Sequence, residues 1–292
     1  MELAVSGRRG PLARLAQYLA LGTLMCGAPA ERVSAQADPS DAGPQANYAF
    51  STQLGSGVYR SHGSTVQVYR LAFGIGLRSL EGHRWGLDLR LPVTFGFYDF
   101  DLASVLESGL PDGLTTLAVA PELRFDIPVR ERWRLMPFGA LGVGRDFSAG
   151  RMSYIAATGT RSLVGLDWRS VHLLVGNRLL YAAYTTSELG FGDDFAGLES
   201  GLDARHSIGF SIAGHRVDAG PFFMHYLYFL SPDLAHFVGE SLSIEQQWEI
   251  GATLGTMTPW RVLGLEMPRV GVGYRFGSGT SIVRIVLGGA FN

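Results

Sequence analysis

Hydrophobic and polar residues alternate with a period of two along most of the chain. In residues 85–97 the odd positions are Trp, Leu, Leu, Leu, Val, Phe and Phe, and smaller or polar residues stand between them. Residues 115–129 and 242–254 repeat the alternation, and no charge falls on the apolar face of any of the three segments. This period is typical of β-strands with one apolar and one polar face.

The alternation extends over twelve segments, and we therefore expect twelve strands. Their length suits a tilted crossing of a bilayer, which takes about 9–11 residues, whereas strands of globular proteins cluster near about 5–6. The expected strands are residues 47–59, 66–78, 85–98, 114–129, 133–144, 152–163, 170–184, 198–210, 216–229, 242–256, 261–276 and 281–291.

The connectors between these segments alternate in length. The long ones follow the third, fifth, seventh and ninth strands, and those after the second, fourth, sixth, eighth and tenth strands are brief. Bacterial transmembrane barrels have short periplasmic turns and longer outer loops. The sequence therefore predicts an all-β fold, a 12-stranded antiparallel transmembrane β-barrel of outer-membrane type, with both termini in the periplasm.

The first 37 residues have the features of a secretory signal peptide. Three arginines precede an apolar run at Leu15–Ala28, and Ala35-Gln36-Ala37 offers small residues for cleavage, with a cut after Ala30 as the alternative. We expect residues 1–37 to be removed, residues 38–46 to form a short periplasmic tail, and residues 47–292 to form the barrel domain.

Composition narrows the possible ligands. Hydrophobic residues make up 47% of the chain and charged residues 17%, and the formal net charge is −2. All 24 basic residues are arginines without a basic cluster, so a nucleic-acid partner is not expected. Cys26, the only cysteine, lies in the signal segment, which leaves the barrel without a cysteine-based metal site or disulfide. No cofactor and no metal site are predicted.

Charged residues of the polar strand faces are predicted to point into the lumen as a charge network. Nine arginines face eight carboxylates, a balance that favours cross-strand pairs over a selectivity ring of one sign. Beside Arg70, Arg78, Arg178 and Asp218, the network is predicted to contain Asp88, Arg90, Glu122, Arg124, Asp126, Glu199, Asp203, Arg205, Glu245, Glu249, Arg269, Arg275 and Arg284.

Charge complementarity predicts how these strands pair. Setting Asp88 opposite Arg124 also sets Arg90 opposite Glu122, whereas sliding the strands by one pair would oppose like charges. By the same reasoning Glu249 is predicted to face Arg269, and Glu245 is expected near Arg275 or Arg284.

The end of the chain and several internal segments resemble known outer-membrane proteins. Residues 281–292 resemble the C-terminal assembly signal of these proteins, with Phe291 on the apolar face. The segments YAFSTQLGSGVYR, LPVTFGFYDF, LESGLDARHSIGFSI, EQQWEIGATLG and PRVGVGYRFG resemble the solitary outer-membrane autotransporter-like β-barrel family over residues 47–292. The resemblance implies a twelve-stranded translocator barrel, often with a helix in its lumen. Residues 38–46 are too few for a passenger.

These observations predict a narrow pore or a structural membrane protein rather than an enzyme. Its expected partners are outer-membrane lipid and the barrel-assembly machinery, and the solute is not specified. The alternative is an outer-membrane hydrolase with a rim active site, which requires a Ser or Asp near one of His172, His206, His215 or His225. A third possibility, a soluble periplasmic ligand-binding barrel, requires the apolar strand faces to point inward.

Overall fold

The computed structural model describes residues 52–292 except 54, 62–63, 81–83, 99–115, 148–149, 188–191, 231–244, 257–260, 263–264, 267–268, 279 and 292. The described residues belong to one compact unit, Asp38–Asn292. The predicted signal peptide and N-terminal tail lie outside the described residues. Within the described ranges, no helix is long and apolar enough to cross a membrane.

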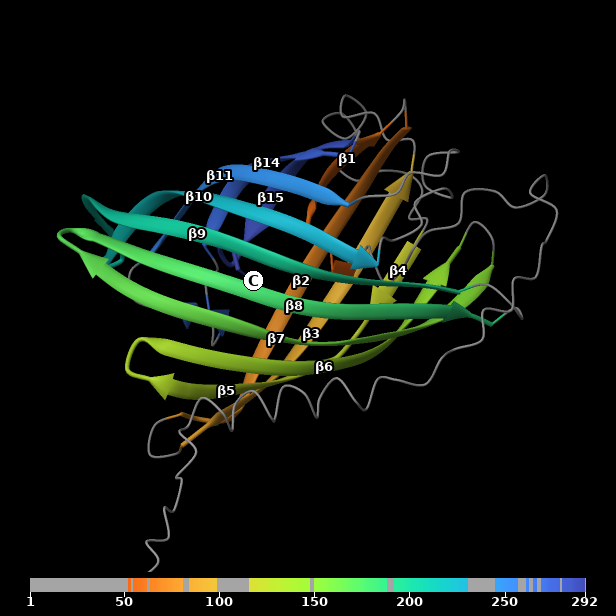
Figure 1. The fold of residues 1–292 in the computed structure, drawn as a ribbon, viewed down its shortest axis with the longest axis horizontal. Coiled ribbons are helices and arrows are strands. Elements are labelled where there is room, and N and C mark those ends of the chain that lie inside the picture. The colour runs from red at the N-terminus through yellow and green to blue at the C-terminus, as the bar shows by residue number, and fades with distance from the viewer. Residues whose placement is uncertain are drawn as a thin grey trace, which may run out of the picture. The chain divides into compact units, whose positions relative to one another are not determined.

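Strands dominate the described part of the chain (Figure 1). They are β1 (Gly57–Ser61), β2 (Ser64–Arg78), β3 (Gly86–Tyr98), β4 (Thr116–Val119), β5 (Glu122–Arg130), β6 (Trp133–Asp146), β7 (Arg151–Trp168), β8 (Val171–Thr186), β9 (Gly192–Ile212), β10 (His215–Leu230), β11 (Gln246–Thr256), β12 (Arg261–Val262), β13 (Leu265–Glu266), β14 (Val270–Gly277) and β15 (Thr280–Leu287).

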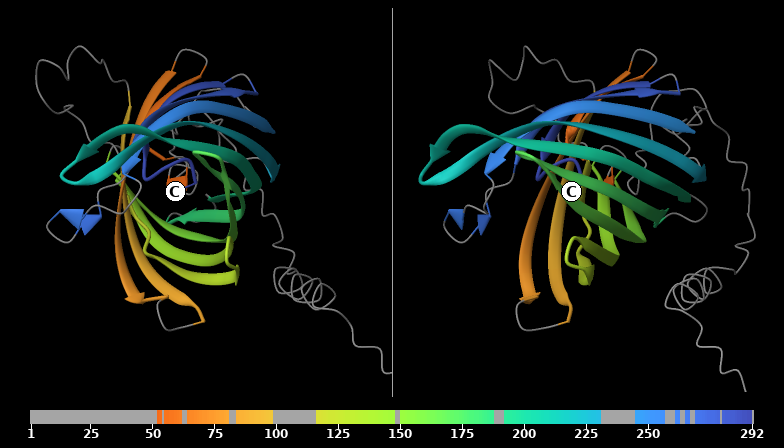
Figure 2. Two further views of the ribbon diagram at one scale, coloured as in Figure 1. Left: turned by 90° about the vertical axis from the view of Figure 1, so that its left-hand side faces the viewer. Right: turned by 60° about the vertical axis from the view of Figure 1, so that its left-hand side comes forward.

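Thirteen of these strands form one antiparallel sheet that closes on itself. Except for β4 and β5, the strands from β1 to β11 pair with their neighbours along the chain, β11 pairs with β14, and β15 pairs with both β14 and β1. Because β4 and β5 both lie between β3 and β6, separated at Pro121, they occupy one position of the wall. The wall therefore has twelve positions, and the left view of Figure 2 looks into the resulting barrel. The predicted fold class is confirmed.

Apolar side chains cover the outer face of this barrel. Leu141, Val272 and Ile75 are 74%, 63% and 62% exposed, although each is large and apolar. The inner face instead holds buried polar groups, among them Glu249 and Asp203, which have no exposed surface. A soluble barrel would place these two kinds of residue the other way round, so the soluble alternative is wrong. The outer face matches the apolar band of a transmembrane barrel in contact with outer-membrane lipid.

Several strand ends differ from the prediction. The first strand begins at Gly57 rather than at residue 47, and the backbone of Thr52 and Gln53 is helical. The expected strand 261–276 is divided, because β12 and β13 pair with each other in a separate two-stranded sheet before β14 begins. The connector after the tenth wall position is therefore longer than predicted.

Short turns at one end of the barrel explain the tight pairing there. The β7–β8 and β9–β10 turns are two residues long, and the β9–β10 turn places Ala213 and Gly214 at φ values of 51° and 82°. Positive φ at both central residues is the type I′ geometry that matches the twist of paired strands. The connectors after β3 and β10 at the opposite end are longer, as the alternation of connector lengths predicts.

Candidate functional site

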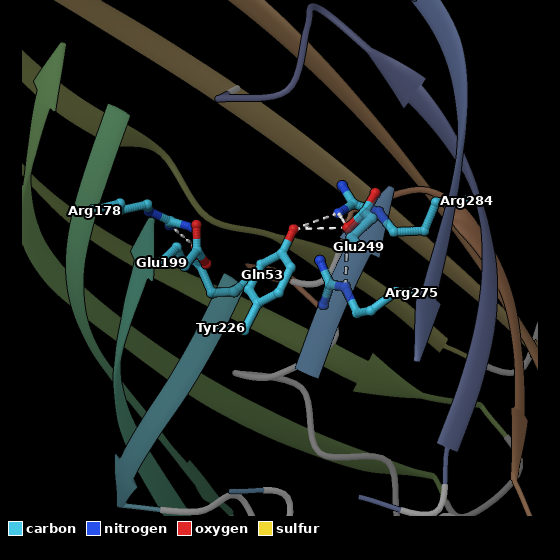
Figure 3. A network of polar contacts seen from close by, with 7 residues as sticks. All are labelled: Gln53, Arg178, Glu199, Tyr226, Glu249, Arg275 and Arg284. Carbon is cyan, nitrogen blue, oxygen red and sulfur yellow. Dashed lines mark hydrogen bonds and ion pairs between the residues drawn. The ribbon is translucent and has the colours of Figure 1, made fainter. Parts of the chain in front are cut away.

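Glu249 forms the centre of a polar network in the lumen (Figure 3). Its Oε2 atom accepts hydrogen bonds from Arg284 Nη1 at 2.7 Å, Arg275 Nε at 3.1 Å and Tyr226 Oη at 2.7 Å. The Arg275 guanidinium also lies over the Tyr226 ring, 3.6 Å from its centroid. Strands β10, β11, β14 and β15 supply these four residues, so one carboxylate connects four strands.

A second group connects the segment before β1 to the opposite wall. Arg178 Nη1 donates to Glu199 Oε1 at 3.1 Å across β8 and β9, and Arg178 Nη2 donates to Gln53 Oε1. Figure 3 shows Gln53 near both this pair and the Glu249 group. Gln53 therefore lies inside the barrel rather than in its wall, which explains why the predicted first strand is shortened.

The other predicted network residues fall into separate groups. The predicted register of β3 and β5 is observed, because Asp88 lies opposite Arg124 and Arg90 opposite Glu122. An ion pair of 2.7 Å joins Arg124 to Asp88. Nearer the short turns, Arg205 pairs with Asp203, Arg269 with Asp218, and Arg134 with Asp126.

Two predicted contacts are wrong. Glu249 lies opposite Arg275 and not Arg269, because β14 begins at Val270 and Arg269 turns toward Asp218. Glu245 is exposed just before β11, where its backbone N–H lies 3.3 Å from Ser278 Oγ. Because Glu245 lies outside β11, it does not belong to the wall in which the alternation of residues 242–254 places it.

Three arginines of the lumen have guanidinium groups with no ion pair or hydrogen bond to any residue that the structure describes. They are Arg70 on β2, Arg90 on β3 and Arg161 on β7. Arg161 was not predicted, because the alternation in residues 152–163 is weak and small residues occupy most of the inward positions. It lies directly opposite Arg178, so two like charges face each other inside the barrel.

The segment after β15 turns into the lumen. Gly288 and Gly289 have φ values of 96° and 105°, which favour glycine, and the Gly288 N–H donates to the Arg269 carbonyl at 2.7 Å. Phe291 then packs against the buried cluster of Phe222, Met224, Tyr226 and Val286. The left view of Figure 2 shows this end of the chain within the ring of strands. The expected placement of Phe291 on the lipid face is wrong.

Phe291 reaches across to the wall opposite β15. A Cβ atom on Gly176 of β8 would lie 2.5 Å from the Phe291 ring, so glycine is required there for the ring to approach. The Phe291 segment and the ion pairs therefore both contribute buried groups to the inside of the barrel.

One histidine lies beside a carboxylate at the short-turn end of the barrel. His172 Nδ1 is 2.7 Å from Asp167 Oδ1, and Arg132 Nη2 is 3.4 Å from the other oxygen of the same carboxylate. Both side chains of the pair are well exposed. His225 is different: it stacks on Trp248 at 4.0 Å on the outer face of β10 and β11, as a girdle histidine would.

The described residues contain no group of three or more His, Cys, Asp or Glu side chains arranged to hold a metal ion. Guanidinium groups and carboxylates, together with the Tyr226 hydroxyl, carry the polar contacts described above.

Comparisons with known proteins find similarity among solved structures but not among protein families or curated proteins. No family model matches the chain, and no curated protein matches it. The fold is similar to that of LpxR from Salmonella typhimurium, with 12% sequence identity and a TM-score of 0.39, over 80% of this chain and 89% of that chain. This likeness concerns the fold alone, and the sequence-based expectation that the protein is not an enzyme is withdrawn.

Proposed function

We propose that the protein is a narrow outer-membrane pore whose lumen is closed by its own ion pairs and by the Phe291 segment. In this proposal, residues 1–37 direct export, the barrel-assembly machinery inserts the barrel, and both termini lie in the periplasm. The support is the pairing of an apolar outer face with a charged inner face. Twelve wall positions lie between barrels filled by side chains and those with open aqueous channels.

The observation that carries the proposal is the complete burial of Glu249 among charged partners inside a membrane barrel. An apolar outer surface and the hydrogen bonds between strands are enough to stabilise a barrel wall in a membrane. Side chains that extend across the lumen also determine whether ions can pass. The charge network predicted from the sequence is therefore proposed as the closing element of the pore, with Phe291 as its apolar part.

The resemblance to autotransporter translocators forms a finer part of the proposal. It is supported by the twelve wall positions and by the helical residues Thr52 and Gln53, because Gln53 reaches Arg178 inside the barrel. This chain would then be a translocator-like barrel that keeps a short N-terminal segment in its lumen.

Replacing Phe291 with alanine is expected to increase ion conduction. The substitution removes a ring that bridges β8 and β10, and a loss of about 1.4 kcal/mol in plugging contacts would raise the open fraction about tenfold. The measurement is single-channel recording of the refolded protein in planar bilayers. Phe229→Ala is the matched control, because Phe229 is 62% exposed on the outer face.

Wild-type protein should insert and show rare, small current steps, and the Phe229→Ala variant should behave in the same way. Insertion of all three proteins without any current, including the Phe291→Ala variant, would reject the pore and leave a purely structural barrel.

A second candidate function is hydrolysis at the rim, favoured by the Asp167–His172 pair. A carboxylate that is hydrogen-bonded to one imidazole nitrogen orients the ring so that the other nitrogen can act as a general base toward water. In the orientation proposed above, this pair faces the periplasm rather than the outside, so the rim would be the opposite one from that of the sequence-based alternative.

If the pair is catalytic, His172→Ala should lower the rate of ester hydrolysis by about 10²–10⁴-fold, the usual contribution of a general base. Chromogenic acyl esters of several chain lengths presented in detergent micelles provide the assay. His215→Ala serves as the control for loss of a histidine elsewhere at that end. Equal rates in wild type and the His172→Ala variant would reject this candidate.

A further inference from the structure

The three unpaired guanidinium groups of the lumen form one cluster. Arg161 lies directly opposite Arg178 on the neighbouring strand, and Arg90 lies directly opposite Glu122. Arg161 also interacts electrostatically with Arg90, Glu122 and Arg124, and Arg90 with Arg124 and Arg70. Arg70 interacts electrostatically with Arg178 and with Glu122. Glu122 is thus the one carboxylate that interacts with all three arginines. The four residues come from four different strands, β2, β3, β5 and β7.

The cluster carries an excess of positive charge. Arg124 is neutralised by Asp88, and Arg178 by Glu199. Glu122, which is 5% exposed, forms no ion pair within the described ranges and leaves three arginines facing one carboxylate. The formal balance of Arg70, Arg90, Arg161 and Glu122 is therefore two positive charges in a desolvated interior.

Such an excess is costly unless an anion compensates it. Arg161 is 6% exposed, its Nε has no hydrogen-bond partner, and the guanidinium directly opposite, on Arg178, repels it. A buried ion without a partner loses its hydration energy, and like charges opposite each other destabilise a sheet. A structural pair would have placed a carboxylate opposite Arg161, as Asp88 is placed opposite Arg124.

We propose that Arg70, Arg90, Arg161 and Glu122 form a binding site for a phosphate-type oxyanion in the lumen. The planar guanidinium fork matches the oxygens of a phosphate and donates two parallel hydrogen bonds to them. A phosphate group near neutral pH carries about −1.5 to −2 charges, close to the excess on the cluster. The ligand is free phosphate or the phosphoryl group of a small solute. Binding is a property of the folded barrel at equilibrium and does not require conduction.

The test is calorimetric titration of inorganic phosphate into the full-length protein, refolded in a maltoside detergent, at constant ionic strength set with chloride. Wild type should bind phosphate saturably at one site. Arg161→Gln should weaken phosphate binding about tenfold, the effect of losing one charge-assisted hydrogen bond. Arg130→Gln is the matched control, because Arg130 is exposed at the end of β5 and should leave binding unchanged.

Glu122→Gln provides a test of opposite sign, because it removes the one carboxylate that repels the anion. The Glu122→Gln variant should bind phosphate more tightly than wild type, which damage to the fold would not cause. This variant therefore tests the phosphate site even if Arg161→Gln fails to fold. Heat-modifiable gel mobility identifies the folded samples.

Absence of saturable phosphate binding in wild type would overturn the proposal, as would weaker binding in the Glu122→Gln variant or an equal loss in Arg130→Gln. Competition by glycerol 3-phosphate would assign the site to phosphoryl solutes, and failure to compete would assign it to free phosphate. A barrel that binds phosphate but carries no current would support this site and reject the pore, so the two proposals fail independently.

Discussion

Replacing Glu249 with alanine is expected to lower the free energy of unfolding by about 3–5 kcal/mol, the usual cost of removing one partner from a buried ion pair. The carboxylate holds Arg275 and Arg284 at once, and all three groups are almost completely buried. Without Glu249, the guanidinium groups of Arg275 and Arg284 would lose the buried carboxylate that they share. The loss should therefore exceed that of an ordinary cross-strand pair.

Denaturant unfolding of the refolded protein in lipid vesicles, followed by tryptophan fluorescence, measures this difference. Glu245→Ala is the matched control: the residue type is shared, but Glu245 is exposed just before β11, and its loss should change stability by less than about 0.5 kcal/mol. Similar destabilisation by both substitutions would mean that the Glu249 network does not hold the wall together.

The wall of the barrel was predictable because a strand with lipid on one side and charge on the other must alternate. This requirement explains why the alternation and the charges of β3 and β5 predict that Asp88 lies opposite Arg124. Each residue of such a pair is constrained by the residues on both sides of it. The predicted strands therefore agree with the structure best in their central parts.

The contents of the lumen were less predictable, because nothing in a single strand specifies what lies across a cavity. The alternation of the last strand predicts a lipid-facing Phe291, yet two glycines with positive φ turn this residue inward. Gln53 and Tyr226 join charged groups on distant strands, so local charge complementarity could not identify them. Arg161 could not be assigned to the lumen from the sequence, because the small inward residues around it leave the alternation weak.

Introducing arginine at Leu141 is expected to destabilise the barrel in a bilayer by about 2–4 kcal/mol, the cost of this charge on the lipid face at the midplane. Leu141 lies in the middle of β6, is 74% exposed, and contacts no counter-ion that could neutralise the new charge. The effect should be measured as the change in free energy of unfolding from phospholipid vesicles.

Val129→Arg separates the membrane term from any general effect of an added arginine. Val129 also points outward and is 39% exposed, but it lies one residue from the end of β5, near the interface. There the cost should fall to about 0–1 kcal/mol. In water both positions would tolerate arginine equally, because both are already exposed. Equal effects of the two substitutions would therefore contradict a membrane around the barrel, whereas a larger loss at Leu141 locates its lipid midplane.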